Sequence, residues 1–155
     1  MVSIIGTDRL KGGYGIAKVA HEQATLSGPL PARVLRAAQF HEFVEQLVQW
    51  GMQGEVAHIP RMRTQLVAAR FVAEALADFA VDPTSTPGPT LEVAGPREES
   101  LEEAAKLLVA RHGYAVRVEA GSDPVDGDAN ESGALLPGPN ARLGGPTFEE
   151  WLDAA

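Results

Sequence analysis

Apolar residues recur at two spacings along this chain, and the two spacings predict alternating strands and helices. Short continuous apolar runs are typical of buried strands, whereas apolar residues three or four apart mark the buried side of a helix. The predicted strands are 2–5, 32–38, 55–59, 65–69, 90–94 and 115–119. The predicted helices are 13–26, 41–50, 70–80, 100–112 and a short one that begins at 146.

This alternation indicates an α/β fold, because a strand–helix–strand unit of this size implies a right-handed parallel crossover. We expect a partial, Rossmann-like parallel sheet built around the strands at 2–5, 32–38 and 90–94. The sheet would belong to a first part, 1–95, and a smaller C-terminal α/β region, 96–155, would cover one end of it.

Two segments lack the periodicity of either element. Residues 82–89 are rich in proline and mark the only plausible boundary inside the chain. Residues 121–145 contain six glycines, three prolines and four acidic residues, and such a stretch is expected to be a functional lid or disordered. The strand at 2–5 is expected to leave an exposed sheet edge, so we expect either pairing with another chain or poor stability of the chain alone.

Composition narrows the class of protein. A chain of 155 residues with 45% hydrophobic content suits one compact domain or fragment. The absence of cysteine excludes disulfides, thiolate metal sites and cysteine nucleophiles. No apolar run reaches 18 residues, and the first residues lack the basic-then-apolar order of a signal peptide. A cytoplasmic protein is therefore the default expectation.

The net charge of -8 is unevenly distributed. Residues 1–80 carry eight Lys and Arg against seven Asp and Glu, whereas residues 81–155 carry five against fourteen. An acidic chain with no basic cluster argues against nucleic acid or an anionic membrane as a partner. The near-neutral first half, which holds Lys18, Arg33 and Arg36, is the better location for an anionic ligand.

Tyr14 and Lys18 are the strongest candidates for chemistry. They are four residues apart in a predicted helix that begins after Gly12 and Gly13, so the phenol and the ammonium lie on one face. A nearby cation favours the ionised form of a phenol, which suits acid–base catalysis on a carbonyl or an alcohol. A hydroxyl from Ser3, in the first strand, could steady the oxygen that Tyr14 protonates. The Tyr-x-x-x-Lys spacing alone is common by chance.

Other kinds of site find less support. The four histidines lack metal-ligand spacing, and His41 and Glu45, which are four apart in a predicted helix, are expected to face solvent. No G-x-S-x-G elbow occurs, which argues against a serine hydrolase. The sequence therefore predicts no metal site.

Several segments, in a fixed order, carry a family resemblance. They are Val-Ser-Ile-Ile-Gly-Thr-Asp-Arg (2–9), Tyr14 with Lys18, Val-Leu-Arg-Ala-Ala-Gln-Phe-His-Glu-Phe (34–43), Thr-Leu-Glu-Val-Ala-Gly-Pro (90–96), Leu-Leu-Pro-Gly (135–138) and Phe-Glu-Glu-Trp-Leu (148–152). The order of strand with serine, Tyr-x-x-x-Lys helix and next strand resembles the short-chain dehydrogenase/reductase superfamily. The residues themselves most resemble its atypical, NmrA-like members.

The resemblance implies an NAD(P)-dependent oxidoreductase. By it, Tyr14 would be the general acid/base, Lys18 would hold the nicotinamide ribose, and Ser3 would bond the reacting oxygen. The backbone of Ala38-Gln39-Phe40 would flank the nicotinamide of an NAD(P)H cofactor.

The chain also departs from the family. No G-x-G-x-x-G follows a strand, so relative to the family the chain corresponds to the C-terminal two-thirds without the nucleotide-binding half. Phe71 also stands where relatives often have an acidic residue. The second interpretation is accordingly a non-catalytic binding or regulatory module that pairs with itself or with a complementary nucleotide-binding chain.

Overall fold

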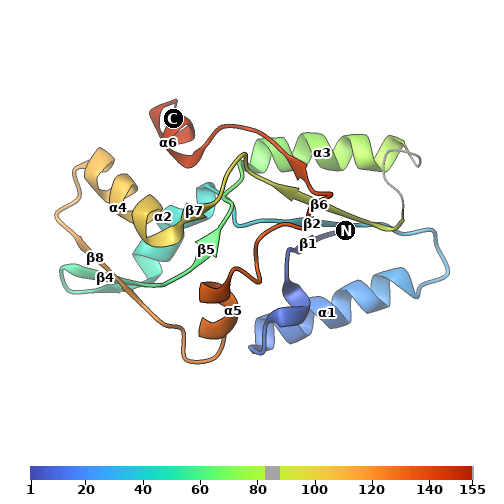
Figure 1. The fold of residues 1–155 in the computed structure, drawn as a ribbon, viewed down its shortest axis with the longest axis horizontal. Helices are drawn as coiled ribbons and strands as arrows, with labels where there is room; N and C mark the ends of the chain where they lie inside the picture. Colours follow the sequence, from blue (N-terminus) through green and yellow to red (C-terminus); the bar gives the residue numbers. More distant parts are fainter. Residues whose placement is uncertain (83–87, 155) are drawn as a thin grey trace.

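A computed structural model of the protein describes residues 1–82 and 88–154 (Figure 1). Its strands are β1 (Val2–Ile4), β2 (Val34–Ala37), β3 (Met52–Gln53), β4 (Val56–Pro60), β5 (Arg63–Thr64), β6 (Thr90–Ala94), β7 (Glu99–Ser100), β8 (Arg117–Gly121) and β9 (Arg142–Leu143). Its helices are the 3-10 turn η1 (Thr7–Arg9), α1 (Gly13–Leu26), α2 (Glu42–Trp50), α3 (Ala69–Val81), α4 (Leu101–His112), α5 (Gly127–Ser132) and α6 (Phe148–Asp153).

The main sheet has four parallel strands in the order β1-β2-β6-β9. This arrangement confirms the predicted α/β class with a Rossmann-like parallel sheet. The register sets Ser3 beside Arg36, and Arg36 beside Glu92. Because successive side chains on a strand point to opposite faces, these three share one face of the sheet.

Helices α1 and α3 lie on opposite sides of this sheet (Figure 1). The α3 side is apolar, with a core of Ile5, Leu35, Ala37, Ala38, Val67, Val72, Ala75, Phe79, Leu91, Val93 and Ala94. The α1 side is different, because among the fourteen residues of α1 only Gly15 and Glu22 are buried. The fully buried part of α1 therefore contains a carboxylate and no large apolar side chain.

A second group of elements lies beyond the main sheet. In it β4 pairs in parallel with β8 and antiparallel with β3, and α2, α4 and α6 pack around them. Its core is Val44, Val48, Ala57, Ile59, Leu66, Leu101, Ala104, Ala105, Leu108, Val109, Phe148 and Leu152. This core combines residues from both sides of position 96.

Two element predictions were wrong. Residues 65–69 form no strand but a buried connection into α3, in which Val67 N–H bonds the Gln39 carbonyl at 3.0 Å. The apolar run is buried there because its backbone is satisfied by the ends of the main sheet. The segment 121–145 is also not structureless, since it contains α5 and β9.

The surroundings of two aromatic rings also differ from expectation. His41, expected to face solvent, is fully buried, with its ring 5.5 Å from that of Phe148 and 5.4 Å from that of Trp151. Trp50, for which the apolar spacing of 41–50 predicts a core position, is 67% exposed and contacts Phe43 edge-on. The helical pattern identified the buried side of α2 but not which of its end residues another element covers.

The boundary expected at 82–89 lies largely outside the described residues, which omit 83–87. Within the part of the chain that the structure describes, no helix has both the length and the apolar composition needed to cross a bilayer.

Candidate functional site

The first turn of α1 brings Tyr14 and Lys18 together. The ammonium of Lys18 lies 5.7 Å from the centre of the Tyr14 ring, so both side chains occupy the same side of the helix. The Thr7 hydroxyl donates to the Gly15 carbonyl at 3.4 Å, which holds this turn beside the chain that leaves β1. Tyr14 is 62% exposed, so a ligand could reach its phenol from solvent.

Ser3 lies in β1, beside Arg36 of β2. It is 2% exposed, and its hydroxyl has no hydrogen-bond partner of ordinary geometry among the described residues. The hydroxyl lies close enough to Glu22 to help lower the pKa of that carboxyl group. Glu22 follows Tyr14 by eight residues, which is about 12 Å along a helix axis. Ser3 therefore lies near the middle of α1.

Glu22 and Arg36 are site residues that the sequence interpretation missed as a pair. Arg36 donates to both carboxylate oxygens of Glu22, through Nε at 3.0 Å and Nη2 at 2.6 Å. Burial by itself would raise the pKa of Glu22, but the Arg36 hydrogen bonds, the nearby Ser3 hydroxyl and the charges of Arg36 and Lys18 lower it overall. The available signal was an arginine in the middle of an otherwise apolar strand, because buried charges require a partner.

The segment Ala38-Gln39-Phe40 follows the carboxyl end of β2, where ligands of parallel sheets usually bind. At least three of its backbone groups are already engaged, one of them the Phe40 carbonyl, which accepts a hydrogen bond from the Phe43 N–H at 3.2 Å. The Ala38 N–H donates to the Val93 carbonyl at 2.9 Å, and the Gln39 carbonyl accepts from Val67. A nicotinamide beside this segment would have to use its other backbone groups or the side chain of Gln39.

The segment 121–145 reaches the start of the same helix. The Asp126 carboxylate accepts hydrogen bonds from the backbone N–H groups of Lys11 and Gly12 at 2.6 and 3.0 Å. The Asp126 N–H in turn donates to the Asp123 side chain at 2.7 Å, which fixes this turn. The segment before α5 is therefore a neighbour of Tyr14 that could contact a ligand there.

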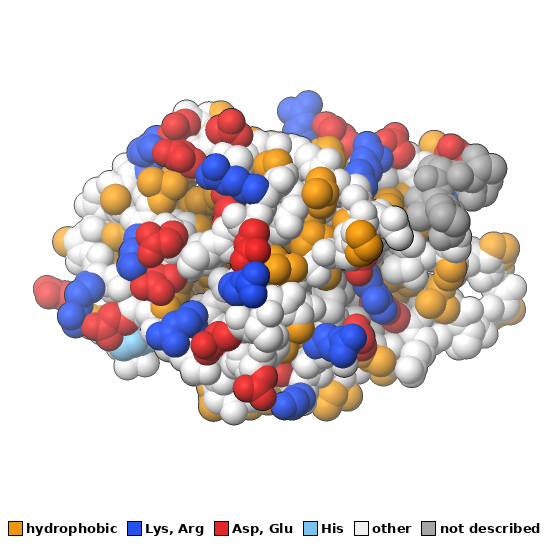
Figure 2. Space-filling view, in the orientation of Figure 1, with side chains coloured by type: hydrophobic (Ala, Val, Ile, Leu, Met, Phe, Trp, Pro, Cys, Tyr) orange, Lys and Arg blue, Asp and Glu red, His pale blue; other side chains and the backbone are white. Residues whose placement is uncertain are grey.

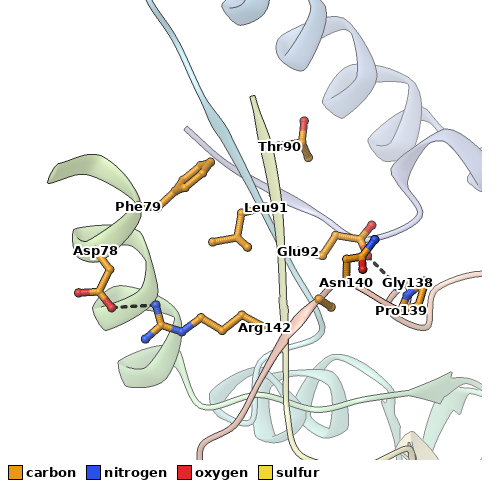
Figure 3. A pocket seen from close by; sticks show the side chains of 10 residues that line it. Asp78, Phe79, Thr90, Leu91, Glu92, Gly138, Pro139, Asn140 and Arg142 are labelled. Atoms are coloured by element: carbon orange, nitrogen blue, oxygen red, sulfur yellow. Dashed lines mark hydrogen bonds and ion pairs between the residues drawn. The ribbon is translucent and has the colours of Figure 1, made fainter. Parts of the chain in front are cut away.

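A separate hollow of about 750 Å³ opens between α3, β6 and the chain before β9 (Figure 3). An ion pair at 2.7 Å joins Asp78 to Arg142 on one side of it, and the Gly138 N–H donates to Glu92 at 2.8 Å on the other. None of the residues predicted for catalysis or cofactor binding lines this hollow. The face drawn in Figure 2 carries interspersed side chains of both charges.

Among the described residues, no three or more His, Asp or Glu side chains gather in a way that could hold a metal ion.

Comparisons with known proteins identify the fold. No protein-family profile and no curated protein sequence matches the chain significantly. Among solved structures it is similar to UDP-glucuronic acid 4-epimerase from Bacillus cereus, with a TM-score of 0.67 and 14% identity over 99% of this chain and 58% of that one. It is also similar to dTDP-glucose 4,6-dehydratase from Bacillus anthracis, with a TM-score of 0.65 and 13% identity over 97% of this chain and 57% of that one.

A third similar structure is TunA, described as an NAD-dependent NDP-hexosamine 5,6-dehydratase, with a TM-score of 0.60 and 14% identity over 98% of this chain and 59% of that one. The chain has the fold of part of these enzymes. It spans somewhat less than three-fifths of the length of each. At these identities the similarity shows the architecture, and the chemistry has to be argued from the residues.

Proposed function

We propose that this chain is the catalytic part of an NAD(P)-dependent oxidoreductase of the atypical, NmrA-like short-chain dehydrogenase/reductase type. The observation that carries the proposal is the contact of Lys18 with the Tyr14 ring at the start of α1. The fold shared with solved enzymes, two of them described as NAD-bound, supports it. In this proposal residues 1–95 form the catalytic part and residues 96–155 the substrate side.

Tyr14 would act as the general acid and base on a substrate in which a carbonyl and an alcohol interconvert. In the reducing direction, its phenol donates a proton to the substrate oxygen while the carbonyl carbon accepts a hydride. Lys18 would stabilise the resulting phenolate by its positive charge, and the Ser3 hydroxyl would form a hydrogen bond with the substrate oxygen. For that last role the oxygen must lie deep, since Ser3 is buried beneath α1.

The residues present fit one end of a dinucleotide. Lys18 would hold the nicotinamide ribose, and Ala38, Gln39 and Phe40 would flank the ring. The cofactor, when bound, supplies the hydride chemistry. The sequence has no G-x-G-x-x-G loop to bind the pyrophosphate, so this chain alone should bind dinucleotide weakly.

Calorimetric titration with NADH and NADPH tests cofactor binding directly. Heat of binding that disappears in Lys18→Met but persists in Tyr114→Phe, a change at an exposed tyrosine in the connection between α4 and β8, would support the proposal. In any turnover assay Tyr14→Phe should reduce kcat by at least about 100-fold, the usual value of a general acid–base residue. Absence of binding at about 1 mM cofactor, the upper end of ordinary KM values, would exclude activity of this chain by itself.

The alternative is a non-catalytic module that completes its sheet with a second chain. The position of β1 at the end of the strand order favours it, because one edge of β1 has no strand neighbour among the described residues. Sedimentation analysis separates the two proposals. A dimer that binds dinucleotide and shows no Tyr14-dependent turnover would favour the module.

A further inference from the structure

Helix α1 is attached to the sheet through a buried ion pair. Glu22 is 6% exposed, and both of its carboxylate oxygens accept hydrogen bonds from Arg36 of β2. Such a two-point contact fixes both the distance between the two side chains and their relative orientation. Since Gly15 has no side chain, Glu22 is the one buried side chain among the residues of α1. The pair is therefore one of the contacts that fix the position of the helix on the sheet.

The same pair lies near two of the residues proposed for catalysis, Lys18 and Ser3, and on the side of α1 that carries the third, Tyr14. Glu22 lies four residues after Lys18 and eight after Tyr14, so all three follow one face of α1. The positive charge of Lys18 is close enough to help lower the pKa of Glu22. On the sheet, Ser3 is the register neighbour of Arg36.

We propose that Glu22, anchored by Arg36, is a positioning residue that holds Lys18 and Ser3 in their places relative to Tyr14. The carboxylate attracts the Lys18 ammonium and keeps it on the sheet side of α1, beside the Tyr14 ring. The contact between an ammonium and an exposed ring is weak by itself, so without Glu22 the lysine side chain would turn to solvent. The roles of Tyr14 and Lys18 rest on the proposed function, whereas the arrangement can be measured without turnover.

Nuclear magnetic resonance of the whole chain tests the arrangement. The side-chain methylene protons of Lys18 next to the Tyr14 ring should show ring-current shifts and cross-relaxation with the ring protons. Glu22→Gln should abolish both signals. The matched control is Glu74→Gln, which removes an exposed carboxylate from an i,i+4 pair with Arg70 on α3, and it should leave both signals unchanged. A folded Glu22→Gln protein that keeps both signals would overturn the proposal.

Should Glu22→Gln fail to fold, Arg36→Lys provides the second variant, because lysine keeps the charge but cannot make the two-point contact. A partial loss of the Lys18 signals supports the proposal, and unchanged signals contradict it. Where the wild-type chain turns over, Glu22→Gln should also lower kcat about 10- to 100-fold, the effect of misplacing a reacting group. A wild-type chain without cofactor binding would refute the proposed function and leave the resonance result valid.

Discussion

The carboxylate of Asp126 accepts a hydrogen bond from the backbone N–H of Gly12, although 114 residues separate the two in the chain. Gly12 immediately precedes α1, and the same oxygen also accepts from Lys11. The first backbone N–H groups of a helix and those just before it need acceptors, and a negative charge there is favourable. The segment that precedes α5 therefore supplies a cap for the helix that carries Tyr14.

Loss of this cap should destabilise the protein. We expect Asp126→Ala to lower the free energy of unfolding by about 1–2 kcal/mol, the usual effect of removing a carboxylate cap. Urea denaturation measures the change. Asp128→Ala is the control, because the Asp128 side chain is 95% exposed and pairs only at 3.4 Å with Lys11, so its removal should cost less than about 0.5 kcal/mol. Equal effects of the two changes would contradict the capping role.

Two neighbouring glycines provide a matched pair of substitutions. A Cβ at Gly12 would lie 2.7 Å from Oδ2 of Asp126, whereas a Cβ at Gly13 meets nothing within 4 Å. Gly12→Ala should therefore weaken the cap and cost about 1 kcal/mol, while Gly13→Ala in the first helical turn should be neutral or stabilising. A double-mutant cycle with Asp126→Ala should show the cost of Gly12→Ala disappear. If the cost persists without the Asp126 carboxylate, its cause is elsewhere.

His41 should make stability depend on pH in the weakly acidic range. Burial lowers the pKa of its imidazole, and the Leu66 backbone and the Glu42 charge only partly oppose this. Since the folded protein holds the proton less tightly than the unfolded chain, stability is fully present well above about pH 6.5 and falls as the pH drops below it. The free energy of unfolding, measured by denaturation at pH values from about 7.5 to 5.5, should show this slope. It should be reduced in His41→Leu and unchanged in the exposed variant His21→Gln.

Glu99 should make stability depend on pH in the opposite direction. Burial raises the pKa of its carboxyl group, although the Phe148 N–H and the nearby Arg97 lower it in part. Because the pKa is raised in the folded protein, the stability that Glu99 contributes is fully present below about pH 4.3. That contribution is lost as the pH rises through the folded-state pKa. Glu99→Gln should therefore raise the free energy of unfolding at about pH 7 relative to the wild type by up to about 1 kcal/mol. A variant that is less stable than the wild type at neutral pH would contradict a net cost of the buried carboxylate.

The local sequence pattern was sufficient to predict most of the helices and strands. The helix predicted at 13–26 is confirmed with the same bounds, and Gly113 ends α4 in the left-handed conformation, as the His112-Gly113 pair indicated. Periodicity and glycine positions act within a few residues, so the chain carries this information locally. Ser100 and Glu103 have capping-box spacing, but no box forms there, because the Ser100 side chain makes no cap hydrogen bond. The box forms instead at Thr147 and Glu150.

The sequence by itself determined the parallel α/β architecture and the proximity of Tyr14 and Lys18, because both follow from spacing along one strand or helix. Only the tertiary structure decided that Glu22 bonds Arg36, that Asp126 caps the start of α1 and that His41 is enclosed by α6. These contacts join residues 14 to 114 positions apart. Whether a carboxylate at such a position meets an arginine, a backbone N–H or water depends on how the elements pack, which no local spacing encodes.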